Sequence, residues 1–233
     1  MTVFGDIPVL CGHRGMGRGH AENTLPSFRG AVAAGLPWVE VDARIAADDV
    51  LVARHDPALA DGRLVAALPA RDTGLMLVAE LLDELPVGIA VNVDVKTSLE
   101  DALRPRERTT AARVADLVRD AGRQVLVTSF DPAALLILRE RAPDVPLGLL
   151  TWTRFPLRKA VAAAAHLGVE VVTASVESFD DDAERAVRVA HEAGLEVGAW
   201  CPAEAERERL VAIGVDCLVI DLEPGDAPAS PPD

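Results

Sequence analysis

Short apolar segments alternate with longer helix-like segments along almost the whole of this chain of 233 residues. The strands that we expect are Ile7–Cys11, Trp38–Ala43, Gly88–Val95, Val125–Ser129, Leu147–Leu150, Val169–Ala174, Leu195–Trp200 and Asp216–Ile220, with a short extra strand at Val50–Arg54. The helices that we expect are Leu25–Ala34, Leu77–Leu85, Arg106–Ala121, Pro132–Arg141, Leu157–Leu167, Asp180–Ala193 and Ala203–Ile213. Several of these strands are continuous apolar runs, which is typical of a parallel sheet covered on both faces.

The number of repeating units and the position of the polar residues favour a closed barrel over an open sheet. Eight βα units in about 220 residues match the usual size of a (β/α)8 barrel. Polar and charged residues gather at the C-terminal ends of the strands, and only a closed barrel brings all those ends to one mouth. We therefore predict an α/β fold with a single (β/α)8 TIM barrel at residues 1–224. Residues 225–233 are predicted to be a disordered tail, because the chain after Leu222 has four prolines and no periodicity.

Charge and cysteine content exclude several classes of function. Acidic residues exceed basic ones by 37 to 23, a formal charge of −14, and such a surface repels nucleic acid and anionic membranes. We expect neither nucleic acid nor a stable membrane association as a partner. No apolar run approaches the ~20 residues of a membrane span, and the first ten residues lack a secretory signal. Three widely spaced cysteines fit a reducing compartment, so we predict a cytoplasmic protein. The sequence does not decide its oligomeric state.

Residues able to bind a metal and a phosphate are concentrated between positions 13 and 56. His13-Arg14-Gly15, Glu22-Asn23-Thr24, Glu40-Val41-Asp42 and His55-Asp56 each stand where an expected strand gives way to a loop. Glu40 and Asp42 point to the same side of their strand, since strand side chains repeat with period two. Two adjacent carboxylates repel each other unless a cation lies between them. These groups together could hold a divalent metal, bind a phosphate and move two protons.

The order and spacing of these strings resemble the glycerophosphodiester phosphodiesterase family. Further matches are Asn92-x-Asp94-x-Lys96, Thr128-Ser129-Phe130-Asp131, Trp200 after a short apolar strand and Gly214-Val215-Asp216 before the last strand. The resemblance covers roughly residues 7–224 and implies the same (β/α)8 barrel. It also implies that the chain hydrolyses a small-molecule phosphodiester, a glycerophosphodiester, to glycerol 3-phosphate and an alcohol.

The resemblance implies a metal site and an acid/base pair. One divalent metal would be held by Glu40, Asp42 and Asp94, and these hard oxygen ligands suit Ca²⁺ or Mg²⁺. His13 and His55, which we place in surface loops, would deprotonate the attacking oxygen and protonate the leaving alkoxide. The family usually has Glu where this chain has Asp94. Asp is one methylene shorter, so we expect a water to bridge Asp94 to the metal, or its strand to lie closer.

The phosphate contacts also follow from the resemblance. Arg14 and Lys96 would bind the non-bridging phosphate oxygens, Arg14 as a fork and Lys96 as a point charge. Glu22 and Asn23 would orient the neighbouring His and Arg or contact the phosphate. Trp200 would form a wall on the alcohol side of the pocket.

Simpler explanations exist for most of these residues. Glu40 and Asp42 could be a solvated strand end paired with arginines such as Arg44, and Trp200 could belong to the core. Arg14 and Lys96 could pair with the acidic residues instead of a ligand, and the histidines could serve only packing.

Two other functions also fit the sequence. One is a headgroup phosphodiesterase acting on lysophospholipids, for which Leu64, Val65 and Leu68 after His55 are the apolar hint. The segment after His55 is short compared with many members of the family, which predicts an open pocket. The other is a catalytically silent barrel that binds phosphate. Cys201 also departs from the family, which usually has Thr after Trp200.

Overall fold

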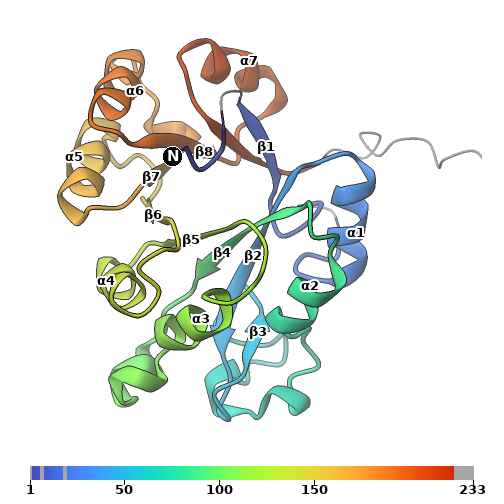
Figure 1. Ribbon diagram of the computed structural model, residues 1–233. Helices are drawn as coiled ribbons and strands as arrows, with labels where there is room; N and C mark the ends of the chain where they lie inside the picture. The colour runs from blue at the N-terminus through green and yellow to red at the C-terminus, as the bar shows by residue number, and fades with distance from the viewer. Residues whose placement is uncertain (1, 6–7, 18–19, 223–233) are drawn as a thin grey trace, which may run out of the picture.

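The computed structural model describes residues 2–5, 8–17 and 20–222, and in this part of the chain it forms a closed barrel of parallel strands with helices outside (Figure 1). The barrel strands are β1 Val9–Gly12, β2 Trp38–Ile45, β4 Ala90–Val95, β5 Val125–Ser129, β6 Leu147–Leu150, β7 Val171–Ser175, β8 Glu196–Trp200 and β9 Cys217–Ile220. β1 pairs with both β2 and β9, which closes the ring. The predicted single-domain (β/α)8 barrel is thus confirmed. The start of the first expected strand, at Ile7, and the predicted tail lie outside the described residues.

The helices follow the expected positions with one notable difference. They are α1 Leu25–Ala33, α2 Val78–Glu84, α3 Thr110–Val118, α4 Pro132–Arg141, α5 Leu157–Leu167, α6 Ala183–Glu192 and α7 Glu204–Ala212. We expected α3 to begin at Arg106, but Thr109 caps it and accepts a hydrogen bond from the Ala112 amide, while Arg106–Arg108 form a separate 3₁₀ turn. The extra strand is β3, Leu51–Ala53, antiparallel to β2. Among the described helices, none is both long and apolar enough to span a membrane.

The alternation of side chains along each strand divides the core into two layers. On β2, Val39, Val41 and Ala43 point outward and pack under the helices. The inward layer fills the lower barrel with Val3, Phe4, Cys11, Trp38, Ala90, Leu126, Val171, Cys217 and Val219. The alternation that buries the outward valines therefore turns Glu40 and Asp42 into the barrel.

The N-terminal segment closes the lower end of the barrel. The rings of Phe4 and Trp38 meet edge to face, with centroids 5.2 Å apart. The amide of Phe4 donates to Glu196 at 3.1 Å, and the amide of Val3 donates to the other carboxylate oxygen. These contacts place the N-terminal segment at the end of the barrel opposite to the carboxyl ends of the strands.

Small residues are required where neighbouring barrel strands carry inward side chains. A Cβ added at Gly198 would lie 2.7 Å from Thr173 Oγ1 and 2.9 Å from its Cγ2. We predict that Gly198→Ala lowers the free energy of unfolding by about 1–3 kcal/mol, the usual cost of overpacking. Urea unfolding measures the change. The matched control is Gly88→Ala, where nothing lies within 4 Å of the new Cβ. A Gly198→Ala protein as stable as the Gly88→Ala protein would show that the barrel interior has room for the added methyl group.

Candidate active site

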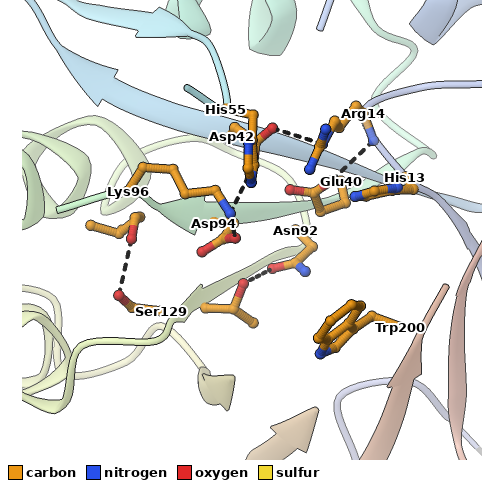
Figure 2. Close-up of polar contacts among 12 residues, drawn as sticks. His13, Arg14, Glu40, Asp42, His55, Asn92, Asp94, Lys96, Ser129 and Trp200 are labelled. Carbon is orange, nitrogen blue, oxygen red and sulfur yellow. Dashed lines mark hydrogen bonds and ion pairs between the residues drawn. The ribbon is translucent and has the colours of Figure 1, made fainter. Parts of the chain in front are cut away.

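The predicted site residues meet in one cavity of about 570 Å³ at the carboxyl ends of the strands. It is lined by His13, Arg14, Glu22, Glu40, His55, Asp94, Lys96 and Trp200, together with residues that we did not predict. Figure 2 shows the charged side chains gathered on one side of this space and Trp200 on the other. Asn23 and Asp42 do not line this cavity: Asn23 lines a smaller one that shares Arg14, Glu22 and His55, and only 1% of Asp42 is exposed.

Three carboxylates are forced together by the register of two strands. Asp42 on β2 is the direct partner of Asp94 on β4, and Glu40 precedes Asp42 by two residues on the same inward face. Oxygens of the three groups lie within 4.8 Å of one another, and all three residues are buried. Burial, together with the charge of Asp42, raises the pKa of Glu40 to about 8. Burial also raises the pKa of Asp94, although Lys96 opposes the shift.

This cluster fits a hard divalent cation. An oxygen spread of 4.8 Å is about twice the 2.3–2.6 Å Ca²⁺–oxygen distance, so one ion can touch all three groups. Asp94 Oδ1 is buried and has no hydrogen-bond partner in the described structure. Arg44 does not neutralise the cluster, because it donates instead to the carbonyl of His55 at 2.8 Å. Glu40 and Asp42 are therefore not a solvated strand end paired with Arg44, which was the simpler explanation.

Two basic side chains stand beside the carboxylates. Arg14 Nε lies 3.1 Å from Asp42 Oδ2, and Lys96 Nζ lies 3.0 Å from Asp42 Oδ1 and also contacts Asp94. Burial alone would raise the pKa of Asp42, but Lys96 and Arg14 outweigh it and hold that pKa below its usual range. Both bases thus pair with acids, as the simpler explanation expected, while both also line the cavity.

Glu22 and Asn23 position the charged groups. Arg14 Nη1 donates to Glu22 at 2.7 Å, and the Arg14 amide donates to Glu40 at 2.9 Å. Asn23 Nδ2 donates to Asp42 Oδ2 at 2.7 Å, and the Asp42 amide donates back to Asn23 Oδ1 at 3.1 Å. Arg14 and Asn23 both adopt positive φ, at 53° and 57°, a conformation that non-glycine residues reach at a cost. Asn23 therefore supports Asp42 and does not face the cavity.

The two histidines occupy different surroundings. The side chain of His13 is only 18% exposed, and its Nδ1 lies 2.8 Å from Asp221. Burial alone would lower the pKa of His13, but Asp221, Cys201 and Glu40 together raise it to about 10. His55 is 45% exposed, with Nδ1 2.9 Å from Asp56. Both histidines lie in loops that follow strands, as expected, but the side chain of His13 is less exposed than that of His55 because it packs against Asp221.

Some of the aromatic residues on the Trp200 side of the cavity were not predicted from the sequence. Of the five Phe and three Trp in the chain, Phe130, Trp152 and Trp200 gather at this cavity. Phe130 stacks on Trp152 at 4.4 Å, and Trp200 meets Phe130 edge to face at 6.5 Å. Trp152 is 67% exposed, and its position just after β6 was the signal that could have identified it. Asp221, directly after β9, could have been found in the same way.

Comparison with known proteins agrees with this geometry. Residues 13–67 and 65–222 match the model of the glycerophosphoryl diester phosphodiesterase family. No curated protein matches the sequence. A solved structure from Silicibacter pomeroyi, described as a glycerophosphoryl diester phosphodiesterase, is 26% identical with a TM-score of 0.80, over 96% of this chain and 92% of that one.

Two more distant solved structures share the fold. A phosphodiesterase from Oleispira antarctica in complex with the product sn-glycerol-3-phosphate is 22% identical, with a TM-score of 0.81, over 95% of this chain and 96% of that one. A glycerophosphodiester phosphodiesterase from Thermotoga maritima is 21% identical, with a TM-score of 0.74, over 93% and 95%. Because the family model matches nearly the whole barrel, the chain belongs to the glycerophosphoryl diester phosphodiesterase family and is an enzyme of that family.

Proposed function

We propose that this enzyme hydrolyses glycerophosphodiesters to glycerol 3-phosphate and an alcohol, with one Ca²⁺ or Mg²⁺ held by Glu40, Asp42 and Asp94. The observation that carries the proposal is a buried carboxylate cluster beside two bases and two histidines in one cavity. The Oleispira antarctica phosphodiesterase, whose structure contains sn-glycerol-3-phosphate, supports the choice of product.

The phosphate would be bound by the basic side chains that line the cavity. Arg14 can offer donors to two phosphate oxygens, while the Lys96 ammonium supplies a point charge. Both charges are fixed in advance by Asp42, so they need little rearrangement as negative charge develops on the phosphoryl oxygens. The bound cation would add Lewis-acid polarisation of the phosphoryl group.

The surroundings of the histidines suggest a role for each. His13 carries its proton at neutral pH and keeps Nδ1 on Asp221, which leaves Nε2 to protonate the leaving alkoxide. His55 is solvent-accessible and would accept the proton of the attacking oxygen. As the new P–O bond forms, the bond to the alcohol breaks, and one proton enters His55 while another leaves His13.

The apolar residues that suggested a lysophospholipid substrate do not form a groove at the cavity. Leu64 is exposed, Val65 is buried in a small separate core, and neither they nor Leu68 line the cavity. The apolar surface on the alcohol side comes from Phe130 and Trp152 with Trp200 instead.

We also propose a cytoplasmic location and a small-molecule substrate as the binding partner. The three cysteines form no disulfide in the described structure, and the net charge of −14 disfavours nucleic acid and anionic membranes.

The proposed division of labour predicts different leaving-group effects for the two histidines. An alkyl alkoxide needs a proton as it leaves, whereas p-nitrophenolate does not. We therefore expect His13→Ala to lower kcat about 10²-fold or more on a glycerophosphodiester with an alkyl alcohol, but far less on a p-nitrophenyl phosphodiester. His55→Ala should lower kcat to a similar extent on both substrates.

The control for this experiment is the fold of each variant. His55→Ala removes a half-exposed side chain and should leave the melting temperature unchanged. His13→Ala leaves Asp221 without its imidazole, so His13→Asn, which can still donate to Asp221, serves beside it. Equal losses on both substrates for the His13 variants would remove the general-acid role.

The carboxylate cluster predicts a metal requirement that all three acids share. We expect activity to be lost in EDTA and restored by Ca²⁺ or Mg²⁺. Because one ion can reach all three groups, Asp94→Asn should weaken metal affinity as much as Glu40→Gln does, by at least roughly tenfold. Isothermal titration of metal-free protein with Ca²⁺ gives these affinities.

A milder effect of Asp94→Asn would restore our sequence-based expectation of a bridging water. The matched control is Asp48→Asn, since Asp48 lies on the β2–β3 turn and accepts from the Ala70 amide instead. Full activity in exhaustively chelated protein would contradict the metal site.

A further inference from the structure

A second group of possible ligands lies next to the carboxylate cluster, and Figure 2 shows His13 beside Glu40. His13 follows β1, Cys201 follows β8 and Asp221 follows β9, and these three strands are neighbours in the barrel. Cys201 Sγ lies 3.6 Å from His13 Nδ1, and Asp221 Oδ1 lies 2.8 Å from the same nitrogen. One ligand atom from each side chain falls within 4.8 Å of the others, and all three residues line the cavity.

The geometry is not that of a cysteine nucleophile. In a nucleophilic relay the thiol and the carboxylate sit on opposite nitrogens of the imidazole, so that the base links them. Here Cys201 and Asp221 share Nδ1, and Nε2 is not between them. A sulfur, a nitrogen and an oxygen that converge on one point are instead the donor set of a chelate.

We propose that His13 Nδ1, Cys201 Sγ and the Asp221 carboxylate form a binding site for a thiophilic divalent cation such as Zn²⁺, with the fourth position open to the cavity. Zinc accepts these three ligand types in tetrahedral geometry, and catalytic zinc sites keep one position open. Zn–N and Zn–S bonds of about 2.0 and 2.3 Å put the two ligand atoms about 3.5 Å apart. The observed 3.6 Å between Nδ1 and Sγ already meets this requirement.

The two clusters would select different cations. Ca²⁺ and Mg²⁺ prefer oxygen ligands, whereas thiolate and imidazole favour zinc and similar metals. A thiolate ligand therefore separates this site from the all-carboxylate site of Glu40, Asp42 and Asp94. The backbone helps to aim the sulfur, because Cys201 is held at a φ of 54° by the hydrogen bond from its amide to Val219 O at 2.8 Å.

A zinc ion bound at this site would prevent His13 from acting as a general acid. This consequence rests on the proposed function, whereas the binding of the cation does not. Zinc binding displaces the thiol proton of Cys201 and the Nδ1 proton of His13 into solvent. The ring is then neutral, with its remaining proton on Nε2. That proton is no longer released near neutral pH, so His13 cannot protonate a leaving alkoxide. The enzyme would thus be inhibited by zinc at a site separate from its activating metal.

The binding claim is tested with Co²⁺, which takes zinc sites and reports thiolate ligation by a near-ultraviolet charge-transfer band. The full-length protein, saturated with Mg²⁺, is titrated with Co²⁺. We expect the band in the wild type, its loss when Zn²⁺ is added, and its absence in Cys201→Ser. Cys11→Ala is the matched control and should keep the band, because Cys11 is buried and burial, with Cys217, raises the pKa of its thiol.

No band in the wild type, or an undiminished band in Cys201→Ser, would overturn the site. Cys201→Asn provides a second variant, since Asn tolerates positive φ and lacks the sulfur. Melting temperatures confirm that both variants fold. His13→Ala and Asp221→Asn should each weaken Co²⁺ binding roughly tenfold or more, and unchanged affinity in either would overturn the three-ligand site.

Inhibition is measured separately from binding. Zn²⁺ should inhibit wild-type hydrolysis over the concentrations that remove the cobalt band, and Cys201→Ser should need at least roughly tenfold more Zn²⁺. If the band behaves as expected in a protein without phosphodiesterase activity, the proposed function fails and the site stands. If the protein hydrolyses phosphodiesters but never shows the band, the zinc site fails and the proposed function stands.

Discussion

The burial of three carboxylates at the mouth of the barrel is the constraint on which the rest of the site depends. Two of them are direct partners across β2 and β4, so strand pairing prevents them from moving apart. In a medium less polar than water the ionised form of each group is disfavoured, and burial together with the charge of Asp42 raises the pKa of Glu40 to about 8. Every neighbouring group can be understood as a response to that charge.

The groups that balance this negative charge lie close to it, and two of them adopt a strained backbone conformation. Lys96, the residue directly after β4, contacts Asp94, and Arg14 contacts Asp42 from a backbone of positive φ. Asn23 uses both ends of its amide on Asp42, again from a positive φ. Backbone strain of this kind persists where surrounding contacts over-determine the conformation. The positive charges are consequently in place before any phosphate arrives, and the cavity is electrostatically prepared for an anion despite the acidity of the protein as a whole.

Much of this arrangement could be predicted from local sequence patterns. Strand alternation predicts that Glu40 and Asp42 face inward, and the position of polar residues after strands predicts one mouth for all of them. What could not be predicted depends on contacts between distant segments. His13 is partly buried by its contact with Asp221, 208 residues away, and no periodicity near His13 indicates this contact.

Other differences have equally physical causes. The later start of α3 depends on a threonine cap that competes with an otherwise helical pattern. The aromatic wall depends on the stacking of Trp152, which follows β6, on Phe130, which follows β5, and the sequence around Trp152 does not indicate this contact. Whether Asp94 approaches Glu40 and Asp42 depends on strand register, which a single sequence does not specify.

The pairing of β1 with β9 has a consequence for the order in which the molecule can mature. The imidazole of His13, directly after β1, contacts the carboxylate of Asp221, directly after β9, and the His13 amide donates to Ile220 O at 2.9 Å. A nascent chain emerging from the ribosome therefore carries an unanchored His13 until almost the whole barrel has been synthesised. In the mechanism proposed above, the acid group is therefore positioned in the same event that closes the barrel.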